Sequence, residues 1–221
     1  MWEALGHVLL ISVALALSTV PIMATILILL SENKRRSSVP YLIGWVLGIA
    51  AIVTGFTVVA AAIPTSSPMA QPMATGIGEI VIGLALVTLA VIVWRRSRGR
   101  SAGDEPKWFS AVDSLGPWSS CGLGFVLNLR PKSILLSAAA GLSLRADGLT
   151  VGGTATVIAI YTALAASTVG LLVIATLISP VKAEARLVRT RATLSQNRQY
   201  ISMVMLLMIG VAIVGNGLTH L

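Results

Sequence analysis

Three charged residues, Glu79, Arg130 and Lys132, lie inside long apolar stretches of the sequence. A charged side chain at the centre of a bilayer costs about 2.5–3.5 kcal/mol even on insertion scales, so it usually faces a partner or a water-filled cavity. Arg130 and Lys132 flank Pro131, and Asn128 lies just before them. Fixed positive charge and hydrogen-bond donors around a helix-breaking residue suit the binding of an anionic group such as a carboxylate, phosphate or sulfate.

The depth of these residues suggests how they interact. A rise of 1.5 Å per residue places Glu79 about 10 Å below the outer face, and Arg130 and Lys132 about 18–22 Å from the inner face, at nearly the same depth. We expect Glu79 to be their counter-charge, directly or across a cavity, or to accept a proton if it has no cationic partner. The alternatives are that Glu79 reaches the interface from a helix end and that the two cations extend toward the outer headgroups.

The elements that must position these residues are six apolar stretches. A membrane span needs about 20 helical residues to cross about 30 Å of hydrocarbon, and each stretch is long enough. Apolar residues make up 56% of the 221-residue chain and charged residues 11%, so the sequence predicts an all-α integral membrane protein. The predicted spans are residues 5–30, 39–63, 73–94, 117–140, 149–179 and 200–218.

The positive charges predict the orientation of these spans. Thirteen of the 16 basic residues lie in the loops after the first, third and fifth spans. Basic loops stay in the cytoplasm, so we expect a multi-pass plasma-membrane protein with both termini outside. This placement explains the net charge of +8 without a nucleic-acid partner. The basic segment 182–198 is either an amphipathic helix on the membrane or a solvated loop.

The chain divides into residues 1–94 and 117–221, joined by a polar linker at 95–116. Three spans in each half predict two repeats of inverted topology, as in many secondary transporters. Pro21, preceded by Ser18 and Thr19, and Pro131 lie in the first helix of each half. Both prolines are expected to break their helices and free backbone carbonyls beside a cavity, although ordinary proline kinks would give the same pattern.

The remaining residue types indicate helix packing and offer few groups for catalysis or metal binding. Gly44 and Gly48 have a small-xxx-small spacing that lets helices approach closely. Further small surfaces are expected at Gly76, Gly78, Gly83, Gly122 and Gly124. The single cysteine, Cys121, excludes an intramolecular disulfide. With His7 and His220 near the outer ends and the carboxylates scattered, we expect no metal site, no cofactor and no enzyme activity.

Several motifs resemble a known family of transporters. They are Ser18–Pro21, the Tyr41–Gly48 segment and the Asn128-Leu129-Arg130-Pro131-Lys132 sequence. Together with the six-span layout they resemble the lysine-exporter superfamily, and more closely its GAP family of peptidoglycolipid- and sulfolipid-addressing proteins. The amino-acid exporters have Pro-Gly-Pro in the first helix and a contiguous Asn-Pro-Lys, and this chain departs from both patterns. The resemblance implies movement of glycolipids to the cell surface, with a larger lipid exporter as partner.

The function expected from the residues and the resemblance is export of an anionic cell-envelope glycolipid or related amphiphile. Arg130, Lys132, Asn128, Ser18 and Thr19 are the predicted substrate-binding residues. The alternatives are proton-coupled export of amino acids or other small polar solutes, and a non-transporting adaptor of a larger lipid exporter. Membrane lipids are expected partners, and a homodimer is a further alternative.

Overall fold

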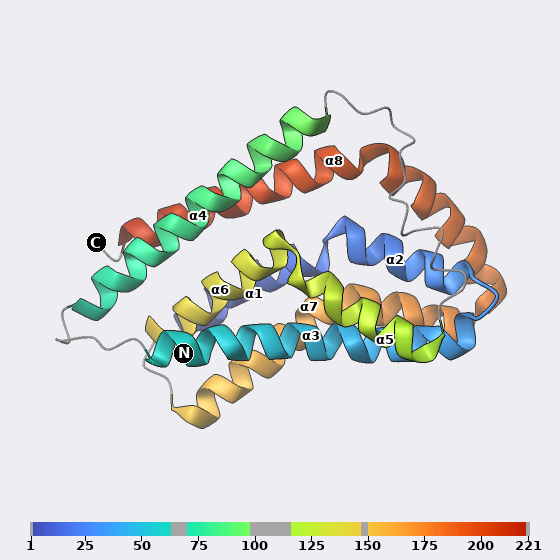
Figure 1. Cartoon of the computed structure of the whole chain (residues 1–221), viewed down its shortest axis with the longest axis horizontal. Coiled ribbons are helices and arrows are strands. Elements are labelled where there is room, and N and C mark those ends of the chain that lie inside the picture. The colour runs from blue at the N-terminus through green and yellow to red at the C-terminus, as the bar shows by residue number, and fades with distance from the viewer. Residues whose placement is uncertain (1, 63–69, 98–115, 147–149, 220–221) are drawn as a thin grey trace.

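The computed structural model describes residues 2–62, 70–97, 116–146 and 150–219, in which all regular structure is helical. Figure 1 shows a bundle in which α1 begins and α8 ends away from the α2–α3 turn. The predicted linker lies mostly outside the described residues, as does His220. The elements are α1 (Trp2–Ala16), α2 (Thr19–Leu30), α3 (Lys34–Ala62), α4 (Ala70–Ser97), α5 (Pro117–Val126), the 3-10 helix η3 (Leu127–Leu129), α6 (Pro131–Ala146), α7 (Val151–Ile178) and α8 (Pro180–Thr219).

Four of the described helical segments are long and apolar enough to cross a membrane: α3, Gly76–Arg95 within α4, α7, and Tyr200–Leu218 within α8. The bent pair α1–α2 makes a fifth candidate. The predicted fourth span, residues 117–140, is divided among α5, η3 and α6. The chain is therefore all-helical in its described parts with four to five candidate spans, and the six-span layout stays a prediction.

The first apolar stretch changes direction between α1 and α2, which are bent by 43° relative to each other. Leu17 and Ser18 lie outside both helices, and Ser18 has an extended backbone with φ −64° and ψ 117°. Pro21 is the third residue of α2, where a backbone N–H has no intrahelical acceptor, so the proline removes no hydrogen bond. In a continuous helix its ring would clash with the carbonyl of Leu17.

A second interruption lies between α5 and α6. Arg130 has an extended backbone with φ −74° and ψ 146°, which is the conformation favoured immediately before proline. Pro131 is the first residue of α6, the helical position that proline prefers. Both discontinuities thus place a proline in the first turn of the following helix.

The helices of the two halves pack in corresponding pairs. Helix α3 lies against α5 and α6, while α7 lies against α1 and α2. Helix α4 runs along α8 in the most extensive interface, as Figure 1 shows, and α3 contacts α7. When α1–α2 is matched with α5–α6, the contacts of α3 with α5 and α6 correspond to those of α7 with α1 and α2, and the α4–α8 and α3–α7 interfaces each correspond to themselves.

Glycines make the closest of these interfaces possible. A Cβ atom on Gly44 would meet the backbone carbonyl of Cys121 on α5, and one on Gly124 would meet the backbone of α3. A Cβ on Gly48 would lie 2.6 Å from the Asn128 amide nitrogen. The predicted close packing at Gly44 and Gly48 is confirmed, whereas a Cβ on Gly122 would meet no atom within 4 Å, so the expectation for Gly122 is wrong.

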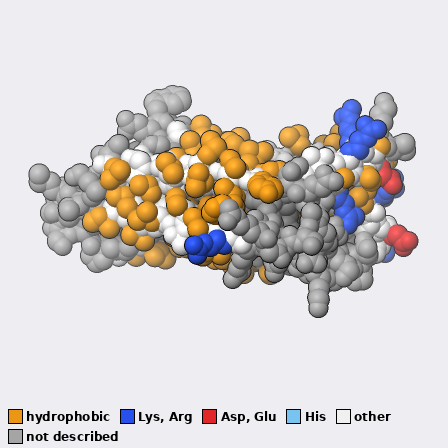
Figure 2. All heavy atoms as spheres, turned by 90° about the horizontal axis from the view of Figure 1, so that it is seen from above, with side chains coloured by type: hydrophobic (Ala, Val, Ile, Leu, Met, Phe, Trp, Pro, Cys, Tyr) orange, Lys and Arg blue, Asp and Glu red, His pale blue; other side chains and the backbone are white. Residues whose placement is uncertain are grey.

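Most charged side chains in Figure 2 gather at one end of the molecule, beside a broad apolar surface, and a separate group of basic atoms lies near the middle. The α2–α3 turn and the first turns of α8 supply exposed charged residues to this end. These include Glu32, Arg35, Arg36, Glu184, Arg186 and Arg189. The apolar surface between the two ends is the part of the molecule suited to contact with lipid tails.

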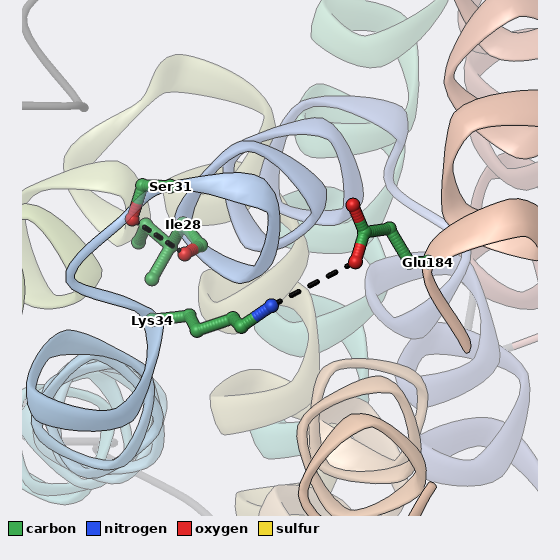
Figure 3. Close-up of polar contacts among 4 residues, drawn as sticks. All are labelled: Ile28, Ser31, Lys34 and Glu184. Atoms are coloured by element: carbon green, nitrogen blue, oxygen red, sulfur yellow. Dashed lines mark hydrogen bonds and ion pairs between the residues drawn. The ribbon is translucent and has the colours of Figure 1, made fainter. Parts of the chain in front are cut away.

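The basic segment before the last apolar stretch belongs to α8. Leu187 is 4% exposed and packs with α2 and with Val173 of α7, whereas Val188 is exposed. Lys34 Nζ at the start of α3 lies 3.8 Å from Glu184 Oε2 of α8, as Figure 3 shows. The same view shows Ser31 donating a hydrogen bond to the Ile28 carbonyl at the end of α2. The expectation of a solvated loop is wrong here, and protein, not lipid, covers Leu187.

The glycine contacts predict a difference between two substitutions on one helix. Gly44→Ala should destabilise the protein by about 1–3 kcal/mol because its methyl group overlaps the α5 backbone. Gly55→Ala, also on α3, has open space at its Cβ position and should be neutral or stabilising because alanine favours the helix. Unfolding midpoints in detergent measure both variants, and equal midpoints would contradict the close α3–α5 contact.

Candidate anion-binding site at two helix discontinuities

A cavity of about 170 Å³ lies where the two helix discontinuities meet. Helices α4 and α8 close its remaining sides, largely with apolar side chains. The site therefore combines polar backbone ends with a low-dielectric wall. Its lining residues are Ser18, Val20 and Pro21, then Leu89 and Val93, then Leu127, Arg130, Pro131, Lys132 and Ser133, and finally Ser202 and Leu206.

Lys132 is the central charged residue of this cavity. Its Nζ atom is buried and has no hydrogen-bond partner among the described residues. An ammonium group carries three donors, and burying a charge without a partner is costly. An anion in the cavity would supply both the missing charge and the missing acceptors.

The neighbours of Lys132 reinforce this preference for an anion. Arg130 lines the cavity with an exposed side chain, which places a second positive charge at its edge. Pro131, Lys132 and Ser133 form the first turn of α6, where backbone N–H groups lack intrahelical partners and the helix dipole is positive. Such a helix start favours negative charge.

The start of α2 brings a second helix N-terminus to the cavity. Ser18, the residue before α2, lines the cavity, and its side chain makes no capping hydrogen bond. Thr19 Oγ1 lies 3.0 Å from Ser202 Oγ of α8. The Pro21 carbonyl accepts hydrogen bonds from Thr25 Oγ1 at 2.7 Å and from Tyr41 Oη at 3.2 Å. These contacts hold the start of α2 against α8 and α3.

Asn128 faces a different neighbour from the one predicted. Its side chain is 1% exposed, and its amide nitrogen donates to the Trp45 carbonyl at 3.3 Å and the Gly124 carbonyl at 3.1 Å. It does not line the Lys132 cavity. The structure gives Asn128 a role in joining η3 to α3, in place of the predicted contact with substrate.

Glu79 also lies apart from the two cations. Its carboxylate accepts hydrogen bonds from Ser143 Oγ at 2.9 Å and Asn216 Nδ2 at 2.7 Å. Ser143 follows Lys132 by eleven residues on α6, a distance of about 16 Å along the helix. The expectation that Glu79 and Lys132 share one depth is wrong, because it assumed an unbroken fourth helix. Direct pairing of Glu79 with Lys132 is therefore excluded.

Comparison with known proteins decides the family. A family model described as Sap, sulfolipid-1-addressing protein, matches residues 8–219. The chain belongs to the sulfolipid-1-addressing protein family. The resemblance to sulfolipid-addressing proteins of the GAP family is thereby confirmed, and the wider likeness to lysine exporters stays a prediction. With its apolar helices, the chain is a membrane protein linked to lipid export. No curated protein and no solved structure matches it.

Some polar residues of this Sap-family protein were missed in the sequence. Ser202 contacts Thr19, while Ser143 and Asn216 hold Glu79. Ser202 and Asn216 lie inside the last apolar stretch, and this unusual position was a signal that could have identified them. Their partners could not be identified in the same way, because the contacts join residues 64 to 183 positions apart.

The revised role of Asn128 in this Sap-family chain predicts a stability effect. Asn128→Ala should lower stability by about 1–3 kcal/mol through loss of its buried hydrogen bonds. The folded fraction should bind an alkyl sulfate as tightly as the unaltered protein, since the side chain does not line the cavity. Thermal unfolding and ligand titration in detergent test the two parts, with the exposed Thr88→Ala as control. A fall in affinity without a fall in stability would contradict this assignment.

Proposed function

We propose that this protein binds the anionic head group of a cell-envelope amphiphile at the Lys132 cavity and carries it across the membrane. The observation that supports this proposal is the buried Lys132 Nζ without a hydrogen-bond partner among the described residues. Two helix N-termini and Arg130 add positive potential at the same place. The family is described as sulfolipid-addressing, and an anionic sulfate or sulfonate head group fits this chemistry.

The size of the cavity limits what enters it. Its volume of about 170 Å³ is below the roughly 300–1,000 Å³ of pockets that hold drug-sized ligands. The site therefore holds a charged group and excludes a whole lipid. The attached tails remain outside, where exposed apolar side chains of the helices meet the bilayer. Because only the head group enters the cavity, the same site can accept amphiphiles that differ in their tails.

The inverted-repeat layout gives this site a means of changing its exposure. In the proposed arrangement, α1–α2 and α5–α6 are the two broken spans, and the chain crosses the membrane six times. The corresponding interfaces of the two halves support it: α3 with α5 and α6, and α7 with α1 and α2. Substrate sites of inverted-repeat transporters lie between the repeats at broken helices, and rocking of one half against the other would open the cavity to each side.

The charged end of the molecule indicates the orientation within this proposal. The loop after α2 and the start of α8 carry the described basic residues of that end. Basic segments remain in the cytoplasm and attract anionic lipid headgroups. The cytoplasmic face is therefore the proposed entry side, and both termini are placed outside the cytoplasm.

Replacing Lys132 tests the binding site directly. Lys132→Met keeps a long side chain but removes the charge, so affinity for a dodecyl sulfate probe should fall about 10- to 100-fold. Arg36→Met is the control, because Arg36 is an exposed cation at the charged end. Binding is measured by titration of the purified protein in neutral nanodiscs.

Transport is tested separately in liposomes that contain the purified protein. A sulfated lipid with a fluorescent tail should cross the bilayer with the unaltered protein and with Arg36→Met, and not with Lys132→Met. Unchanged affinity in Lys132→Met would refute the binding site. Binding without any crossing would refute transport by the protein alone and favour an adaptor of a larger exporter.

A further inference from the structure

A second polar cluster lies inside the bundle at a distance from the Lys132 cavity. Glu79 of α4 is 1% exposed, and its two carboxylate oxygens are held by Ser143 of α6 and Asn216 of α8. Both donors are uncharged. The cluster is therefore held by hydrogen bonds, in contrast to the predicted pairing of Glu79 with cations.

This cluster borders a cavity of its own. The cavity has a volume of about 300 Å³, and apolar side chains of α1, α6 and α8 complete its wall. Among them are Leu10, Ile11 and Ile213. A largely apolar pocket with a few convergent polar groups is the usual form of a small-molecule binding site.

The two cavities lie one after the other between the same helices. Helices α4, α6 and α8, with the α1–α2 segment, line both cavities. On α8, Ser202 and Leu206 border the first cavity, and Ala212 and Asn216 border the second. Ten residues of helix correspond to about 15 Å, so the second cavity lies about half a membrane thickness further along α8.

An apolar layer separates the two cavities. Leu86 of α4, Leu136 of α6 and Ile209 of α8 lie between the lining residues of the two sites on their respective helices. All three are at most 6% exposed and belong to one packed hydrophobic cluster. A charged group cannot cross such a layer without movement of the helices.

We infer that Glu79, Ser143 and Asn216 form a second binding station for the uncharged, hydroxyl-bearing part of the amphiphile. A carboxylate has about four acceptor positions, and two of those on Glu79 are occupied by protein donors. The remaining acceptor positions suit sugar hydroxyls, whereas a second anion would be repelled. This inference deepens the proposed function. It rests on that proposal because the Lys132 cavity is taken as the first binding site of the amphiphile.

The test uses two photoreactive probes in phosphatidylcholine nanodiscs. One is a neutral alkyl glucoside, and the other is an alkyl sulfate with the same tail and a diazirine beside the head group. The glucoside should label segments at the second cavity, around Leu10 or Ile213, and the label should fall about tenfold in Glu79→Leu. The sulfate should label the Lys132 cavity equally in both proteins. Thr88→Val, at an exposed site on the same helix, is the control.

A milder substitution covers the case in which Glu79→Leu does not fold. Ser143→Ala removes the hydroxyl that holds the Glu79 carboxylate in its orientation toward the cavity, and it should reduce glucoside labelling about threefold. Glucoside labelling that is unchanged in Ser143→Ala and in folded Glu79→Leu, or that falls on other segments, would overturn the second station. Sulfate labelling that does not depend on Lys132 would instead refute the proposed function, so the two failures are distinguishable.

Discussion

The burial of the Lys132 ammonium group is the constraint on which the site depends. A cation inside a membrane protein is tolerated only where water, a partner or a ligand can reach it. The Lys132 Nζ has no hydrogen-bond partner among the described residues and lines a cavity bounded by Ser18, Arg130 and Ser202. The surrounding helix ends offer N–H groups and positive potential, which suit an anion. The Lys132 ammonium group depends on such an anion for its counter-charge.

The two prolines and the glycines make that cavity possible in different ways. Pro21 and Pro131 each lie in the first turn of a helix, where a backbone N–H has no intrahelical acceptor. Neither proline therefore removes an intrahelical hydrogen bond, and the residues before each one leave the helical conformation. Gly44 and Gly124 let α5 approach α3 closely, which fixes the position of η3 and of the start of α6. Helix discontinuity and close packing together bring residues 18 and 132 to one place.

The sequence predicted the types of element well and the contacts between them only in part. Hydropathy identifies the apolar helices because bilayer thickness sets their length, whereas the six-span inverted repeat with helices broken at proline stays a prediction. Of the predicted residues, those that line the cavity are Ser18, Pro21, Arg130, Pro131 and Lys132. Asn128 was misplaced because it was grouped with Arg130 and Lys132 by its position in the sequence. Glu79 was misplaced because depth was counted along a straight fourth helix, and the interruption at Arg130 invalidates that count. The contact of Thr19 with Ser202 joins residues 183 positions apart, which no local pattern reports.

Cysteine accessibility at Ser202 tests the central claim, a wet and positively charged cavity beside Lys132, most directly. Cys121→Ser removes the single native cysteine, and Ser202→Cys then places one thiol on the cavity wall. After each rate is divided by that reagent's rate with a free thiol, a sulfonate-bearing methanethiosulfonate should modify this thiol about tenfold faster than a trimethylammonium analogue. That ratio corresponds to a difference of about 1.4 kcal/mol between the two reagents, or about 0.7 kcal/mol of local potential per unit charge. Alkyl sulfate should block the reaction. An unreactive thiol, or faster modification by the cationic reagent, would contradict the account.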